Sequence, residues 1–163
     1  MRAISFFWAL AVTSAVTAPM PALAQDAETI ERGLRVSIIG GCHDCHTEGY
    51  SEAKGKSDPE KALKGSSLGW RGPWGTIYAS NLRIIAERSE TEEYFVQLLK
   101  TTETRPPMPW YNLRAMEQSD MVALFHYIKS LGAPGDPPPK DVRPSQEPTT
   151  PYIQFAPPQM PKS

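Results

Sequence analysis

Cys42-His43-Asp44-Cys45-His46 is the stretch of sequence that decides the fold. It holds both cysteines of the chain and two of its three histidines. Two thiols three residues apart lie on one side of a single turn, so each can add to one vinyl group of a haem. The adjacent imidazole then lies where it can bind the iron. The motif C-x-x-C-H therefore predicts one covalently attached haem c, with Cys42 and Cys45 as its anchors and His46 as an axial iron ligand.

Three other uses of these side chains compete with haem attachment. An exported protein can form a disulfide, but cysteines this close in sequence enclose a very small loop, and cross-linking it gains little. A redox-active C-x-x-C of the thioredoxin type needs a surrounding βαβ pattern, and none is visible. Structural zinc sites usually take their ligands from two separated pairs, whereas the remaining histidine, His126, lies far away on an expected helix. Haem attachment is therefore the favoured interpretation.

The N-terminal segment has the features of a secretory signal peptide. Arg2 precedes an apolar run over about residues 3–16, and Ala22-Leu23-Ala24 has the A-x-A cleavage pattern. The run is short and rich in Thr, Ser and Ala for a membrane-spanning helix, so an uncleaved anchor is the less favoured alternative. We expect a signal peptide over residues 1–24, a periplasmic location, and no membrane span in the mature chain.

Length and charge limit the organisation and the partners of the mature chain. Residues 25–163 are enough for one domain and little more. The formal net charge is −1 for the whole chain, and loss of Arg2 with the signal peptide lowers it by one unit. A nearly neutral chain argues against a nucleic-acid partner, because such proteins usually carry a basic patch.

Apolar spacing predicts a helix on either side of the haem motif. The first covers residues 27–39 and ends at Gly40-Gly41, directly before Cys42. Gly33 lies within this helix, where a glycine costs stability relative to alanine. Close approach of another helix would explain that glycine. The last helix opens at Ser119, and Gly132 follows as its C-terminal stop.

The middle of the chain is expected to be mostly loop. Residues 47–81 are rich in Gly, Ser, Lys, Trp and Pro, with a short helical turn expected at 59–64. A long loop in a compact domain needs a reason, and wrapping one edge of a prosthetic group is such a reason. Ser89-Glu90-Thr91-Glu92 has the form of a capping box and predicts a helix to about Lys100. No segment reads as a convincing pair of strands.

The C-terminal segment, residues 134–163, contains ten prolines. A segment of this composition is neither helix nor central strand, so we expect an extended or disordered tail. Tyr152, Ile153 and Phe155 interrupt it with apolar groups. Two interpretations stay open: a flexible tail, and a tail in which residues 152–155 pack back on the domain or on a partner.

A six-coordinate haem needs a second iron ligand opposite His46. Met108 lies in Arg105-Pro106-Pro107-Met108-Pro109-Trp110, where three prolines stiffen the chain by fixing φ. Such a loop can hold a thioether at the iron, as in cytochromes with His/Met ligation. Met116 and Met121 fall in or beside the last helix, where methionine more often fills a core, and His126 lies on that helix. Met108 is therefore the favoured axial ligand.

These motifs together resemble those of the class I c-type cytochromes. The resemblance covers roughly residues 27–131: a helix, the C-x-x-C-H motif, a ligand loop with Met108, and a final helix. More narrowly, Gly75-Thr76-Ile77-Tyr78-Ala79-Ser80-Asn81-Leu82 and Pro107-Met108-Pro109 resemble haem domains in the cytochrome subunits of periplasmic alcohol and gluconate dehydrogenases. The resemblance implies an all-α cytochrome c fold over residues 25–133, with few helices and long loops around one haem.

The same resemblance suggests further haem contacts. The side chains that would line the loop side of the haem are Trp70, Trp74, Tyr78 and Asn81. The polar tips of Trp and Tyr could bond a haem propionate, and Arg105 could pair with one as a charged donor. Ordinary core packing and a solvated surface charge are the alternatives. We also expect His46 to donate its other ring N–H to a backbone carbonyl, with Pro59 and Pro73 as candidates.

Closed coordination by His46 and Met108 would leave the iron no position for substrate, so electron relay is the expected function. The leading hypothesis is a periplasmic monohaem cytochrome c, not an enzyme, that carries single electrons between a redox donor and acceptor such as a dehydrogenase and a terminal oxidase. The runner-up is a haem-bearing subunit of a periplasmic dehydrogenase complex, docked with help from residues 134–163. A haem sensor or peroxidase-like enzyme with a labile sixth ligand is the alternative of another class.

Overall fold

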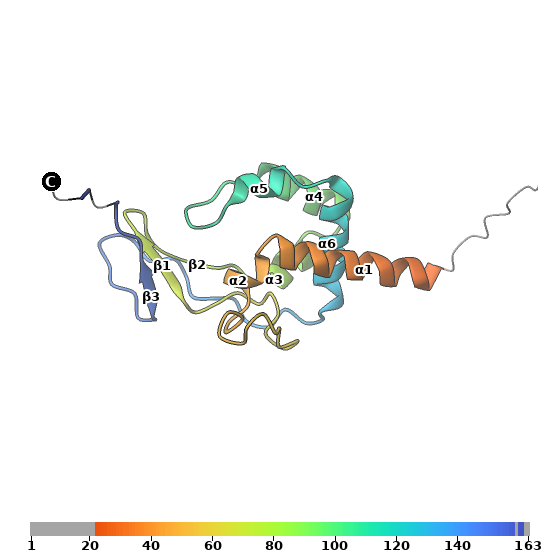
Figure 1. Cartoon of the computed structure of the whole chain (residues 1–163), viewed down its shortest axis with the longest axis horizontal. Coiled ribbons are helices and arrows are strands. Elements are labelled where there is room, and N and C mark those ends of the chain that lie inside the picture. Colours follow the sequence, from red (N-terminus) through yellow and green to blue (C-terminus); the bar gives the residue numbers. More distant parts are fainter. Residues whose placement is uncertain (1–21, 159, 162–163) are drawn as a thin grey trace, which may run out of the picture.

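The computed structural model describes residues 22–158 and 160–161 of the chain. The expected signal peptide lies outside the described residues except at 22–24, where the first helix already begins. Six helices and three short strands are found in the described part (Figure 1). The helices are α1 (Ala22–Ile39), α2 (Cys42–His46), α3 (Leu82–Arg88), α4 (Glu92–Thr101), α5 (Trp110–Arg114) and α6 (Gln118–Ser130). The strands are β1 (Gly69–Gly72), β2 (Gly75–Tyr78) and β3 (Tyr152–Gln154).

Helices α1 and α6, the first and last helices of the described chain, cross in close contact (Figure 1). Gly33 lies at the crossing, and a Cβ added there would overlap the backbone carbonyl of Ala123 and the Cβ of Tyr127. The expected reason for this glycine is therefore confirmed. The absence of a side chain lets the two backbones approach closely in the middle of α1, the helix that precedes α2.

The expected helix of the middle region forms, but its cap differs from the prediction. The N-cap of α4 is Thr91, whose hydroxyl accepts the backbone N–H of Tyr94 at 3.2 Å. Ser89 instead caps the end of α3 and donates its hydroxyl to the carbonyl of Ile85 at 2.8 Å. The S-x-x-E pattern spans the junction of two helices, and α3 was not predicted. The short α5 was not predicted either.

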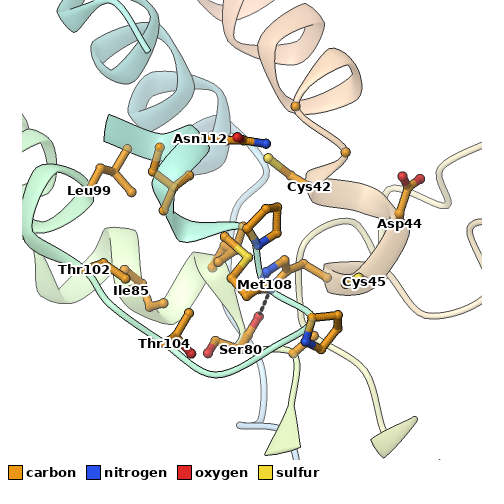
Figure 2. Close-up of a pocket in the computed structure, with 18 of the residues that line it drawn as sticks. Cys42, Asp44, Cys45, Ser80, Ile85, Leu99, Thr102, Thr104, Met108 and Asn112 are labelled. Atoms are coloured by element: carbon orange, nitrogen blue, oxygen red, sulfur yellow. Dashed lines mark hydrogen bonds between the residues drawn. The ribbon is translucent and has the colours of Figure 1, made fainter. Parts of the chain in front are cut away.

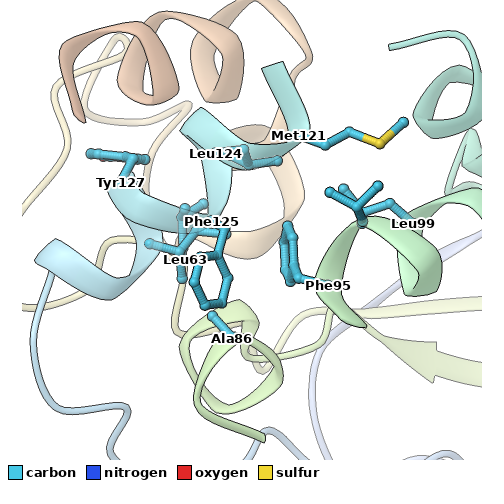
Figure 3. Close-up of a cluster of buried hydrophobic side chains, with 10 residues drawn as sticks. Leu63, Ala86, Phe95, Leu99, Met121, Leu124, Phe125 and Tyr127 are labelled. Carbon is cyan, nitrogen blue, oxygen red and sulfur yellow. The ribbon is translucent and has the colours of Figure 1, made fainter. Parts of the chain in front are cut away.

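The core lies where α6 packs against α3 and α4 (Figure 3). Phe95 of α4 packs against Phe125 of α6 with ring centroids 5.3 Å apart. Leu63, from the loop after the haem motif, is fully buried in the same cluster. The further buried members are Ala86, Val96, Leu99, Met121, Leu124, Tyr127 and Ile128. The core therefore joins the predicted helices to the loop that continues from Cys42–His46.

A small sheet with strand order β2-β1-β3 forms at the other end of the molecule, where the prediction of no strand pair was wrong (Figure 1). Strands β1 and β2 form an antiparallel hairpin in which Trp70 faces Ile77. Strand β3 comes from the Pro-rich tail and pairs in parallel with β1, with Ile153 opposite Trp70. The remainder of the domain is helices and loops, as the prediction of few helices and long loops states.

The C-terminal tail is extended and packs back on the domain. Phe155 lies against the rings of Trp70 and Trp74, with centroids 5.9 and 6.1 Å away. The Tyr78 hydroxyl bonds the hydroxyl of Thr150 at 2.7 Å. Of the two interpretations left open by the sequence, the one in which residues 152–155 return to the domain describes this structure.

The buried guanidinium of Arg83 connects α3 to two other segments. It donates to the carbonyls of Pro59 at 2.5 Å and Ala62 at 2.8 Å in the loop before β1. It also donates to the carbonyl of Leu131, just after α6, at 2.6 Å. The short helical turn expected at 59–64 is present as a run of hydrogen-bonded turns, and it supplies two of these carbonyls.

Candidate functional site

A cavity of about 390 Å³, lined mainly by apolar side chains, lies between the haem motif and the segment that connects α4 to α5. Helix α2 and the end of β2 form one wall, α3, α4 and α6 contribute to its depth, and Pro107, Met108 and Pro109 form the opposite wall. Figure 2 shows Met108 together with Cys42 and Cys45 around this space. The structure thus brings together the predicted haem anchors and the favoured second ligand.

The imidazole of His46 is buried and oriented by the backbone. Its Nδ1 lies 2.7 Å from the carbonyl oxygen of Ser80, the bond marked by the dashed line in Figure 2. A carbonyl only accepts, so Nδ1 carries the proton and Nε2 keeps its lone pair. Burial lowers the pKa of His46, which favours this neutral form. The expected carbonyl bond is present, but Ser80 supplies it, and neither Pro59 nor Pro73 does.

Both cysteines are free thiols in this structure. Burial raises the pKa of the Cys42 thiol to about 11, and burial followed by the charge of Asp44 raises that of Cys45. Redox-active C-x-x-C motifs instead hold a thiol whose pKa is lowered. No group of three or more His, Cys, Asp or Glu side chains in the described part is arranged to hold a metal ion. Neither a thioredoxin-like site nor a zinc site is therefore supported.

A buried hydrogen-bond network holds the haem motif against α1 and α6. His43 is 1% exposed, stacks on Tyr50, and bonds Ser37 through Nε2 at 3.1 Å and Thr47 through Nδ1 at 2.8 Å. Ser37 donates its only hydroxyl proton to the carbonyl of Leu34 at 2.7 Å, so it accepts from Nε2.

The other end of the network has the complementary arrangement. Burial lowers the pKa of His43, which favours its neutral form. With the proton on Nε2, the Nδ1 atom accepts from the hydroxyl of Thr47, whose oxygen also accepts the backbone N–H of Leu63 at 2.8 Å. The sequence analysis did not identify this network. Thr47 at helical spacing from His43 was its only signal, because Ser37 lies six residues before His43 and on the other side of Gly40-Gly41.

The other candidate iron ligands lie away from the cavity. Met121 is fully buried in the core cluster, and Met116 packs against the edge of that cluster. His126 bonds Glu92 through Nε2 at 2.7 Å. None of the three lines the cavity, whereas Met108 does.

The further haem contacts suggested by the resemblance divide into two groups. Trp70 and Tyr78 line the cavity. Trp74, Asn81 and Arg105 do not, and their roles toward haem stay predictions. Trp74 is half-buried, and its Nε1–H is the only buried side-chain donor of the described residues without a partner.

Asn81 and Arg105 have partners within the chain. The oxygen of the buried Asn81 amide caps α3, and its Nδ2 donates to the tail carbonyls of Pro134 at 2.7 Å and Asp136 at 3.1 Å. Arg105 forms an ion pair with Asp141 of the tail. No local pattern in the sequence indicates either tail contact, because the partners lie far along the chain.

This donor set suits a covalently attached haem. Two neutral thiols for vinyl addition and an imidazole with a free Nε2 surround an apolar cavity of the size used for cofactors. The family model for cytochrome c matches residues 30–132. The chain belongs to the cytochrome c family. It therefore has the cytochrome c fold and binds haem c through Cys42 and Cys45.

Comparisons with curated proteins and with solved structures identify no relative of this cytochrome c. Members of the cytochrome c family are in general electron carriers rather than enzymes, and they act between redox partners. None of the described helices of this cytochrome c has the length and apolar character required to cross a membrane.

Proposed function

We propose that this cytochrome c is a periplasmic carrier of single electrons whose one haem has His46 and Met108 as axial ligands. The observation that carries the proposal is the position of Met108, which lines the same cavity as Cys42, Cys45 and His46. Met116, Met121 and His126 do not line it. Met108 therefore has the access that a second ligand needs.

The residues around the cavity suit a haem that transfers electrons and has no free coordination position on its iron. When bound, haem supplies a one-electron ferric/ferrous couple. The Ser80 carbonyl holds His46 in the tautomer with a free Nε2. Leu99, Leu124 and Ile128 contribute to an apolar lining that keeps water away. A methionine ligand and a buried setting both favour a raised reduction potential.

The location and the partners rest on other observations. Residues 1–24 have the pattern of a secretory signal peptide, which supports export to the periplasm. A carrier there takes an electron from a donor such as a dehydrogenase and delivers it to an acceptor such as a terminal oxidase. Membership of a dehydrogenase complex is the other arrangement consistent with the narrower resemblance of Gly75–Leu82.

Replacement of Met108 by alanine tests the ligation. The ferric holo-protein of Met108→Ala should change from a low-spin, six-coordinate spectrum to a high-spin one and should bind added imidazole readily. Met116→Ala is the matched control, because Met116 is also partly buried but lies outside the cavity. It should keep the wild-type spectrum. Wild-type spectra in Met108→Ala would exclude Met108 as the ligand, and a high-spin wild type would favour a sensor or peroxidase-like function.

Fractionation of expressing cells tests the location and the assembly. The holo-protein should appear in the periplasmic fraction with Gln25 as its first residue. Size-exclusion of a native extract should place it at the size of a single small chain. Retention in the cytoplasmic fraction would contradict export, and co-migration with a large dehydrogenase would replace the free carrier by the complex subunit.

A further inference from the structure

The segment that carries Met108 has few connections to the remainder of the chain. Residues 102–109 link α4 to α5 and form one wall of the cavity. Thr102 is bonded to the end of α4, and Glu103 is paired with Arg114 of α5 at 2.8 Å. Within residues 104–109 of the described structure, one side chain is bonded to a side chain outside the segment. This side chain is Arg105, and its partner is Asp141.

Asp141 belongs to a part of the tail that is itself firmly attached. Its neighbour Val142 exchanges two backbone hydrogen bonds with Thr76 of β2, each 2.8 Å long. Gly75 is at φ +97°, and a Cβ there would overlap the carbonyl of Val142, so the tail passes directly over the start of β2. Strand β3 secures the tail again further along, by its pairing with β1.

The two carboxylate oxygens of Asp141 connect the two walls of the cavity. Oδ1 accepts the backbone N–H of Tyr78, a cavity residue of β2, at 3.3 Å. Oδ2 accepts from the guanidinium of Arg105, three residues before Met108. A single side chain of the tail thus connects the wall that holds Ser80 and His46 to the segment that holds Met108.

We propose that Asp141 is a positioning residue: through Arg105 it holds the segment 102–109 in place at the cavity, with Met108 facing the haem motif. The part that concerns iron ligation rests on the proposed function, whereas the anchoring of the segment does not. The Pro-rich tail then has a task inside this molecule. It connects β2 to the ligand segment through Asp141.

The expected contribution of the ion pair between Arg105 and Asp141 follows from its exposure to solvent. The side chains of Arg105 and Asp141 are 47% and 45% exposed, so solvent screens the attraction. An exposed pair of this kind shifts an equilibrium by about two- to fivefold. A shift of this size has little influence on the stability of the whole fold. It matters for the segment 102–109 because few other interactions hold that segment in place.

The first experiment measures imidazole binding to the ferric holo-protein of Asp141→Asn. The asparagine oxygen can still accept from Tyr78, so the change removes the ion pair and leaves the tail attached. If Met108 is the ligand, imidazole has to displace it, and its apparent affinity should rise about two- to fivefold. Arg105→Gln should give the same rise, and the double variant no further rise. One molar salt should reduce the difference from wild type.

Glu147→Gln is the matched control. It removes the other ion pair between the tail and the domain, that of Glu147 with Arg71 of β1 at 2.8 Å. That pair does not touch the segment 102–109. Imidazole affinity should therefore stay at the wild-type value, although both variants lose one carboxylate from the same tail. An equal rise in both variants would overturn the proposal, because it would then reflect general loosening of the tail.

Backbone ¹⁵N relaxation of the holo-protein separates the anchoring from the ligation. The order parameters of residues 103–105 and 108 should fall in Asp141→Asn and stay at the wild-type values in Glu147→Gln. Unchanged order parameters in Asp141→Asn would overturn the proposal. Equal imidazole binding by wild type and Met108→Ala would instead show that the proposed ligation is wrong, and the order parameters alone would then decide the role of Asp141.

Discussion

The two walls of the haem cavity are held in different ways. The wall of the C-x-x-C-H motif is fixed by hydrogen bonds of the buried His43. Its two ring nitrogens are bonded to Ser37 of α1 and to Thr47, which directly follows the motif. The wall of Met108 is a loop between α4 and α5. Within the described structure, its side chains bond one side chain beyond these two helices, through the half-exposed ion pair of Arg105 with Asp141. One wall is therefore set by buried, directional bonds and the other by a screened charge.

This difference separates two requirements of an electron carrier. The attached side has to present Cys42, Cys45 and His46 in a fixed arrangement, and buried polar networks with every partner satisfied give such rigidity. Under the proposed ligation, the opposite side offers the thioether of Met108 on a segment with few connections. Changes to the first wall should affect the stability of the whole fold, and changes to the second should affect ligation with little loss of stability.

The largest effect is expected at the helix crossing that supports the first wall. Gly33→Ala places a methyl group where the carbonyl of Ala123 lies, so α1 and α6 have to separate. Overpacking of this kind should lower the free energy of unfolding by about 3 kcal/mol, which exceeds the gain of about 1 kcal/mol from better helix propensity. Denaturant unfolding of the holo-protein measures it.

Glu28→Ala provides the control for that substitution. It lies in the same helix on an exposed side and should change the stability by no more than about 0.5 kcal/mol. If Gly33→Ala were as stable as this control, α1 and α6 would have to pass each other at a greater distance than in this structure.

A smaller loss is expected when the polar support of the first wall is removed. His43→Leu leaves the Thr47 hydroxyl without its acceptor and Ser37 without its donor. The free energy of unfolding should fall by about 2 kcal/mol, in the range for buried polar groups left unsatisfied. His126→Leu is the control, because it removes a half-exposed histidine paired with Glu92 and should cost less than about 1 kcal/mol.

The pH dependence of stability checks the same residue independently. Burial lowers the pKa of His43 below its ordinary value of 6.5, with Asp44 opposing the shift. The unfolded chain then binds the extra proton more readily, so the stability that neutral His43 contributes is present above about pH 6.5 and declines as the pH falls below it. His43→Leu should lack that part of the decline. An unchanged profile would mean that other groups cause it.

The smallest of these effects is expected at the sheet to which the tail is attached, whose strand β2 leads into the first wall. Phe155→Ala removes ring contacts with Trp70 and Trp74 and should reduce stability by about 1 kcal/mol. The loss should be local, so trypsin should cleave the tail after the exposed Lys140 faster, while the wall of the C-x-x-C-H motif stays protected. Ile153→Ala is the control, because its side chain is 42% exposed and the backbone pairing of β3 remains. Equal cleavage of both variants would contradict an anchoring role for Phe155.

The fold could be predicted from sequence where local patterns determine it. Apolar spacing located α1, α4 and α6, and Gly33 correctly indicated a close helix approach. The strands could not be found, because β1 and β2 are only four residues each and β3 pairs with a partner far away in the chain. Such pairings depend on tertiary contacts that periodicity does not contain.

For the site, too, some residues could be predicted from the sequence and others could not. The C-x-x-C-H motif and the Pro-bounded Met108 identified residues that line one cavity, because covalent attachment and ligation need particular residue types. The support for these residues could not be predicted. Ser80 bonds His46 with a backbone carbonyl, which any residue could supply, and the partner of Arg105 lies in a tail whose composition gives no register.

The position of β3 at the C-terminal edge of the sheet has a consequence for biosynthesis. A chain delivered N-terminus first presents Cys42–His46 long before Asp141 and Tyr152–Gln154 arrive. Cofactor attachment can then take place while the opposite wall is still without its tail. The tail then adds β3 to the edge of the sheet and pairs Asp141 with Arg105 after the group is already covalently bound.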